Sequence, residues 1–381
     1  MDNSKKKQKA YLDILHEELV PAMGCTEPIA IAYAAAKARQ ILGRTPDRVL
    51  VEASDNIIKN VKSVVVPNTG NLKGIAASAA AGIIAGDAEK ALEVISLVNE
   101  EEKKAIKNFL ENREIKTCKL TSDLKFDLLV TVFQGKSKAC VQISHFHTNI
   151  VLITKDDEIV YQNQDCDEIS TSSLADRSIL NVKDIVEFAQ SVEIAEVEKL
   201  LQRQIDYNTK IAEEGLRRQW GANIGSVLLE TWGDDIKIRA KAKAAAGSDA
   251  RMSGCELPVV IVSGSGNQGI TASVPVIEYA KELAVEKDEL LRALIVSNLV
   301  TIHQKTGIGR LSAYCGAVSA GVGAGAGITW LHGGRYTQIS HTIVNALAIA
   351  SGIICDGAKS SCAGKIALSV EAGILGFHMY Q

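Results

Sequence analysis

The sequence predicts an α+β protein, in which a mainly helical part is interrupted by an inserted α/β module. Two observations support this class. Apolar residues repeat with a helical period near the start of the chain and again after residue 182, whereas between residues 45 and 163 they alternate as in strands. The expected division is therefore a discontinuous helical domain, residues 1–44 plus 164–381, and a module at residues 45–163.

The first 42 residues predict two helices separated by a turn. Apolar residues between Tyr11 and Leu19 form one helical stripe, and the alanine-rich run at residues 29–42 favours a second helix. The turn between them, Pro-Ala-Met-Gly-Cys-Thr-Glu-Pro, has Cys25 at its centre.

Each later element follows from the local period of the apolar residues. In the module, strands are expected at residues 48–53, 62–66, 115–120, 125–133, 139–147 and 149–161, and helices at residues 74–85 and 89–112. After a polar, loop-like stretch at 164–180, helices are expected at residues 183–201, 210–230, 276–287 and 290–305. Glycine-rich points at residues 264–269, 307–327 and 352–364 interrupt this helical part.

Composition excludes several classes of protein. The 42 Lys and Arg residues nearly balance the 45 Asp and Glu residues, so the chain lacks the basic excess of a charge-driven nucleic-acid binder. The apolar stretches at 313–330 and 341–355 are shorter than the roughly 20 residues of a membrane span, so we expect buried helices and no membrane partner. No apolar segment follows the basic start, which favours a cytoplasmic protein.

The positions of the cysteines are more informative than their number. Eight cysteines are too few for a disulfide scaffold, and thiols stay reduced in the cytosol. Cys315, Cys355 and Cys362 lie in glycine-bearing segments, where a loop could turn thiolates towards one metal centre. Their spacing matches neither a ferredoxin nor a zinc pattern, so ordinary packing is the competing interpretation. Cys255 has no assigned role.

A glycine loop, Gly-Ser-Gly-Asn-Gln-Gly at residues 264–269, also has two interpretations. It matches the dinucleotide pattern Gly-x-Gly-x-x-Gly, but the surrounding β-α-β context is poor. The other interpretation from the residues alone is a tight loop.

Four segments resemble a known family. They are residues 21–28 around Cys25, residues 252–275 with the glycine loop, Ser-Ala-Tyr-Cys-Gly-Ala around Cys315, and Cys-Asp-Gly-Ala-Lys-Ser-Ser-Cys at residues 355–362. The C-terminal half resembles the alpha domain of iron–sulfur L-serine dehydratases. The whole chain resembles the related L-cysteine desulfidases. The turn around Cys25 resembles the N-terminal segment of the desulfidases and has no obvious counterpart in the dehydratases. One departure is the gap between Cys355 and Cys362, which is longer and contains proline in the dehydratases.

The resemblance implies a cofactor and a reaction. Cys315, Cys355 and Cys362 would hold a [4Fe–4S] cluster with one open iron, and Cys25 would be either the fourth ligand or the base. The reaction would be non-oxidative β-elimination of L-cysteine to pyruvate, ammonia and sulfide, with L-serine as the alternative substrate. The resemblance also implies a substrate site in the glycine loop, where the carboxylate of the amino acid would be held by Ser265, Asn267, Gln268 and Gly269. A thiolate can act as the base if a metal or a helix N-terminus lowers its pKa. The Ala- and Gly-rich helices would also allow a homodimer.

Three other functions compete with this interpretation. A pyridoxal-phosphate lyase would use Lys305 or Lys359 as the Schiff-base lysine. A metal-containing sensor would bind the cluster without turnover. A dinucleotide-dependent enzyme would use the glycine loop for its cofactor.

Overall fold

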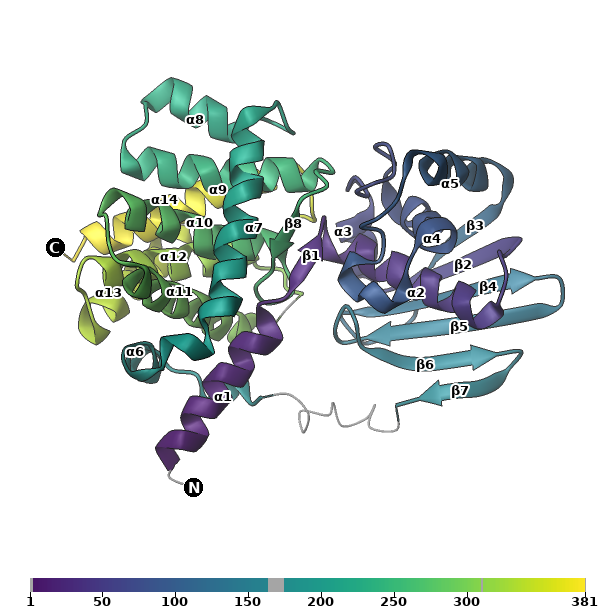
Figure 1. Ribbon diagram of the computed structural model, residues 1–381, viewed down its shortest axis with the longest axis horizontal. Helices are drawn as coiled ribbons and strands as arrows, with labels where there is room; N and C mark the ends of the chain where they lie inside the picture. The colour runs from purple at the N-terminus through teal and green to yellow at the C-terminus, as the bar shows by residue number, and fades with distance from the viewer. Residues whose placement is uncertain (1–2, 164–174, 310, 381) are drawn as a thin grey trace.

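The computed structural model describes residues 3–163, 175–309 and 311–380 (Figure 1). The expected domain boundary at residue 164 and most of the loop predicted at 164–180 lie outside these ranges. Within them, the chain forms a mainly helical part and an α/β module that lie side by side, which confirms the α+β class.

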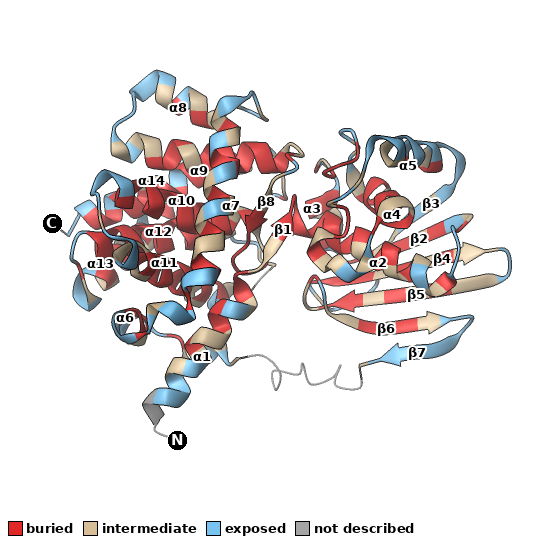
Figure 2. Cartoon of the chain, viewed as in Figure 1, coloured by how far each residue is buried: buried red, intermediate tan, exposed pale blue. Residues whose placement is uncertain are grey.

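The helical part is built around one buried helix. Its elements are α1 (Asn3–Glu18), α6 (Val182–Ser191), α7 (Glu198–Arg217), α8 (Ile224–Trp232), α9 (Ile236–Met252), α10 (Gly266–Glu282), α11 (Lys287–Ile308), α12 (Gly316–Leu331), α13 (Tyr336–Ala350) and α14 (Cys362–His378). Helix α12 packs against α10, α11, α13 and α14, and almost all of its side chains are buried (Figure 2). None of the described helices is long and apolar enough to cross a membrane.

The module is a six-stranded sheet with helices on one face. Its elements are β2 (Arg48–Ala53), α3 (Asp55–Val61), α4 (Gly74–Ala85), α5 (Glu100–Asn112), β3 (Glu114–Lys119), β4 (Asp127–Gln134), β5 (Ser137–Ser144), β6 (Ile150–Lys155) and β7 (Glu158–Gln162). The strand order is β3-β2-β4-β5-β6-β7, and only the β2–β3 pair is parallel. Burial alternates along β2, β4 and β5, as expected when helices cover one face.

Helix α2 (Thr26–Leu42) lies with the module, which corrects the prediction that residues 1–44 belong to the helical domain. It packs between α4 and strands β4 and β5, so its alanines are buried on more than one side. At Gly82 in α4, an added Cβ would lie 2.0 Å from the Ala32 carbonyl oxygen. The chain therefore passes from one part to the other at the turn around Cys25.

Several local predictions are wrong for identifiable reasons. Residues 62–66 do not form a strand: helix α3 ends at Val61 just before them, and Val65 makes a single antiparallel bridge, to Lys73. The helix predicted at 89–112 is divided, since Asn99 caps a new helix, α5, with a capping box to Glu102. The strand predicted at 149–161 is a hairpin that turns at Asp156 and Asp157, both with positive φ.

The close crossing of α12 and α14 gives a testable prediction about stability. An added Cβ at Gly321 would lie 2.2 Å from the Ser369 carbonyl oxygen, whereas nothing lies within 4 Å of one at Gly307 in α11. We expect Gly321→Ala to lower the free energy of unfolding by about 1–3 kcal/mol, because the helices must move apart. Gly307→Ala should be neutral or slightly stabilising. Urea unfolding of both variants checks this, and equal midpoints would contradict it.

Candidate functional site

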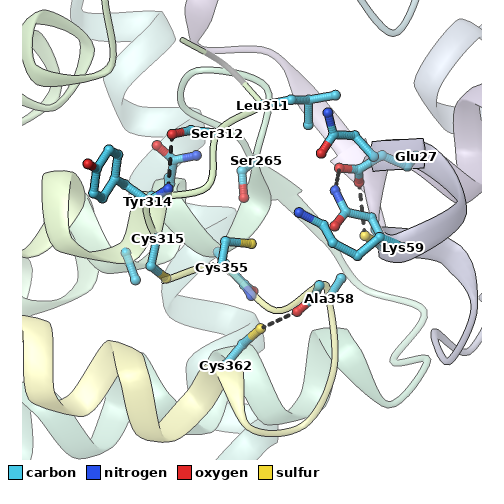
Figure 3. A pocket seen from close by; sticks show the side chains of 18 of the residues that line it. Glu27, Lys59, Ser265, Leu311, Ser312, Tyr314, Cys315, Cys355, Ala358 and Cys362 are labelled. Carbon is cyan, nitrogen blue, oxygen red and sulfur yellow. Dashed lines mark hydrogen bonds between the residues drawn. The ribbon is translucent and has the colours of Figure 1, made fainter. Parts of the chain in front are cut away.

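A solvent-open pocket lies between the module and the helical part (Figure 3). The module side comes from the start of α2 and from α3, which contribute Glu27, Lys59 and Asn60. The opposite side comes from the segments that lead into α10, α12 and α14. All the cysteines expected to carry chemistry line this pocket, namely Cys25, Cys315, Cys355 and Cys362. The module therefore supplies one wall of the site.

Four helices begin at this pocket. Cys25 is the N-cap residue of α2, Ser265 that of α10 and Cys315 that of α12, while Cys362 is the first residue of α14. A helix N-terminus carries a partial positive charge and backbone N–H groups without intrahelical partners. Their convergence favours anions in the pocket, whether thiolates, a carboxylate or an anionic cofactor.

Cys315 and Cys355 are brought together by a short antiparallel contact. Tyr314 pairs with Ile354, and backbone hydrogen bonds join Cys315 N to the Ile353 oxygen at 3.0 Å and Cys355 N to the Ala313 oxygen at 2.7 Å. Alternate residues of an extended segment face opposite sides. Tyr314 and Ile354 are exposed, so the two thiols lie on the other side, towards the pocket.

Cys362 reaches the same wall because the preceding loop packs against the module. Gly357 has φ +99°, and an added Cβ there would lie 2.8 Å from the Lys59 carbonyl oxygen. Only glycine adopts this positive φ and also leaves room for the Lys59 carbonyl at low energetic cost. The Cys362 sulfur lies 3.8 Å from the Gly357 carbonyl oxygen.

An acidic residue in this loop pairs with Lys359, one of the two Schiff-base candidates, and with a second lysine. Asp356 pairs with Lys359 at 2.9 Å and also with Lys365. Hydrogen bonds from these lysines lower the pKa of Asp356. The interpretation of Lys359 as a Schiff-base lysine is therefore weakened, whereas the buried Lys305 does line the pocket.

Cysteine thiolates are the ligands that hold iron–sulfur clusters, and three of the pocket's cysteines come from the helical part. Among the described residues, no three His, Cys, Asp or Glu side chains are placed to hold one ion. Burial raises the pKa of both Cys315 and Cys362, so these groups are thiols in the protein alone. A [4Fe–4S] cluster bonds each cysteine through a different iron, which requires separated sulfurs around one space. Three thiols around an anion-favouring pocket fit that group.

Cys25 donates a hydrogen bond to a buried carboxylate. Its sulfur lies 3.2 Å from Glu27 Oε2, and Asn60 Nδ2 donates to Glu27 Oε1 at 2.9 Å. Burial and the nearby Glu27 carboxylate raise the pKa of Cys25 well above its usual value, while Arg251 lowers it. The protein's own groups therefore do not supply the lowered pKa that a thiolate base requires, and a bound metal would have to supply it. Burial also opposes ionisation of Glu27, but His147 and these hydrogen bonds bring its pKa below the usual value.

The glycine loop contributes three of its four predicted residues. Ser265, Asn267 and Gln268 line the pocket, and the Thr26 hydroxyl donates to the Gly264 oxygen at 2.9 Å, which ties the loop to α2. Gly269 is a correction, because it faces away from the pocket.

The packing around this loop explains why Gly269 does not line the pocket. An added Cβ at Gly269 would lie 2.0 Å from the Val260 carbonyl oxygen, so this glycine serves helix–strand packing. The preceding strand, β8 (Pro258–Val260), pairs only with β1 (Pro21–Met23), and antiparallel. A dinucleotide-binding βαβ unit is therefore not formed here.

Two charged pocket residues were missed by sequence reasoning. Arg251 lies on α9, a helix that was not predicted, and it is only 2% exposed. Glu27 lies at the start of α2, on the module side. A long cationic side chain within an alanine-rich helix was the available signal for Arg251, because such residues are rarely buried without a partner.

Comparison with known proteins places this chain in a family. The family described as serine dehydratase alpha chain matches residues 89–381, and the chain belongs to it. Among its relatives, a UPF0597 protein of Desulfitobacterium hafniense is 60% identical over all of this chain and 88% of its own length. UPF0597 proteins of Lachnoclostridium phytofermentans and Treponema denticola are 57% and 48% identical, over 96% and 98% of this chain and 88% of each relative.

Proposed function

We propose that this protein is an iron–sulfur lyase that removes sulfide from L-cysteine and yields pyruvate and ammonia. The observation that carries the proposal is the meeting of Cys25, Cys315, Cys355 and Cys362 in a pocket where four helices begin. Cys315, Cys355 and Cys362 would hold a [4Fe–4S] cluster. When bound, this group supplies a Lewis-acid iron that accepts the leaving sulfur.

The proton transfers fall to Cys25 and Glu27. In the protein alone the proton stays on Cys25, because the pKa of the thiol is raised and that of Glu27 is lowered. A bound cluster would lower the pKa of this thiol, so that its proton could pass to Glu27 Oε2 along the 3.2 Å hydrogen bond. The resulting thiolate would remove the Cα proton of the substrate. The Cβ–S bond then breaks, and sulfide leaves. The aminoacrylate product takes up water and decomposes to pyruvate and ammonia, which balances the reaction.

L-Serine is the second candidate substrate. The family match is to a serine dehydratase alpha chain, and a hydroxyl can also leave from a Lewis-acid iron. The same residues would act in the same order, with water released in place of sulfide. A soft sulfur is the better partner for iron in a thiolate-lined site, and this favours L-cysteine.

The test begins with anaerobic purification of the full chain and measurement of its iron and acid-labile sulfide. Sulfide and pyruvate are then assayed with L-cysteine and with L-serine. We expect about four irons per chain and equal amounts of sulfide and pyruvate from L-cysteine. Iron without turnover of either amino acid would indicate a sensor, and an aldimine absorbance band without iron would indicate a pyridoxal-phosphate enzyme. Either result would overturn the proposal.

A further inference from the structure

We propose that Arg251 and the N-terminus of α10 bind the carboxylate of a free α-amino acid, and that Gln268 receives its amino group. This inference rests on the proposed function for the identity of the substrate. It adds the residues that would bind the two charged groups of such a substrate, and above all Arg251, a residue outside the glycine loop.

The guanidinium of Arg251 is buried without a carboxylate partner. Its Nη1 donates to Asn267 Oδ1 at 3.0 Å, and no Asp or Glu of the described residues pairs with it. Its Nε is buried and has no hydrogen-bond partner among the described residues, and Arg251 is one of the residues that line the pocket. A buried, unpaired cation is costly, and an anionic ligand would remove that cost.

The position of this guanidinium coincides with the start of α10. An added Cβ at Gly266, the first residue of α10, would lie 2.3 Å from Arg251 Nε. Asn267 lies in the same first turn, and its Oδ1 accepts the hydrogen bond from Arg251 Nη1. The Ser248 hydroxyl donates to the same oxygen at 3.2 Å. Asn267 is thus a positioning residue for Arg251. A carboxylate here would meet a guanidinium and helix N–H groups together.

Gln268 supplies an acceptor next to this cation. Its side chain is 5% exposed, lines the pocket and lies against Gly316 at the start of α12. Its Oε1 has no hydrogen-bond partner among the described residues. A buried amide oxygen without a partner is also unfavourable, and an ammonium group would satisfy it. A cation from the end of α9 and a free acceptor in the first turn of α10 line the same pocket, and they match the two charged groups of an amino acid.

The test is anaerobic calorimetry of the full, iron-loaded chain with L-alanine, which has no leaving group, and with ethylamine, which is L-alanine without its carboxylate. We expect Arg251→Gln to weaken L-alanine binding on the order of 10- to 100-fold, because one charge-assisted contact is lost. Ethylamine should bind both proteins equally weakly. Gly266→Ala is the second variant, since it displaces the guanidinium while keeping its charge, and it should also weaken L-alanine binding.

The control variant is Arg203→Gln. Arg203 lies on α7 outside the pocket and donates to the Leu19 oxygen, and its loss should leave L-alanine binding unchanged. The proposal is overturned if Arg251→Gln binds L-alanine like the unmodified protein, or if this variant loses its iron, which would assign Arg251 to the cluster. If L-alanine binding depends on Arg251 while neither L-cysteine nor L-serine is turned over, the proposed function fails and this inference stands.

Discussion

Cys355→Ser is expected to remove most of the bound iron from the anaerobically purified protein. Cys355 lies in the middle of the thiol-lined wall, held by its backbone hydrogen bond to Ala313 beside Cys315. A serine hydroxyl keeps this geometry but is a poor ligand for iron, because soft thiolate ligands select iron–sulfur clusters. Cys315→Ser and Cys362→Ser should have the same effect. Iron content, acid-labile sulfide and the visible absorbance of the cluster are the measurements.

The matched control is Cys118→Ser. Cys118 lies on the edge strand β3, away from the pocket. Cys118→Ser replaces one sulfur by one oxygen, as Cys355→Ser does. It should keep its iron and its turnover. Equal iron in the Cys355 and Cys118 variants would mean that Cys355 is a packing residue, and the cluster assignment would be lost with it.

The elements that the sequence predicted well are those with a strong local pattern. Strand β2 and helix α4 have the predicted bounds, since a short alternating run and a run of small residues are each decisive over their own length. Helix α2 was predicted as a helix but assigned to the wrong part. Its alanines are buried on several sides, so no polar face indicates which neighbour it contacts.

The site was only partly predictable, because it is made by tertiary contacts. Cys315 and Cys355 are separated by 39 residues and meet through one bridge between Tyr314 and Ile354, which no spacing rule describes. The resemblance to a known family, and not the spacing, brought these cysteines together. Arg251 was missed because its helix was missed. The convergence of four helix N-termini depends on the packing of the module against the helical part.

The last prediction separates the two roles considered for Cys25. We expect Cys25→Ala to keep its iron and its affinity for L-alanine, while kcat for sulfide release falls roughly 10²- to 10⁴-fold, the usual contribution of a general base. Cys25 comes from the module and its thiol is committed to Glu27, whereas the other three cysteines come from the helical part. A base must give up its proton in every turnover, which a neighbouring carboxylate assists, whereas a ligand loses its proton once, when the cluster binds.

The neighbouring carboxylate and a second buried cysteine complete this test. Glu27→Gln keeps the size of the side chain, but a neutral amide cannot take up the thiol proton, so turnover should fall while iron stays bound. Cys255→Ala removes a buried cysteine outside the pocket and should leave both turnover and iron content unchanged. Loss of iron in Cys25→Ala would instead make Cys25 the fourth ligand. The Cα proton would then need another acceptor, and Glu27, the buried carboxylate on the same wall, would be the group to test for that role.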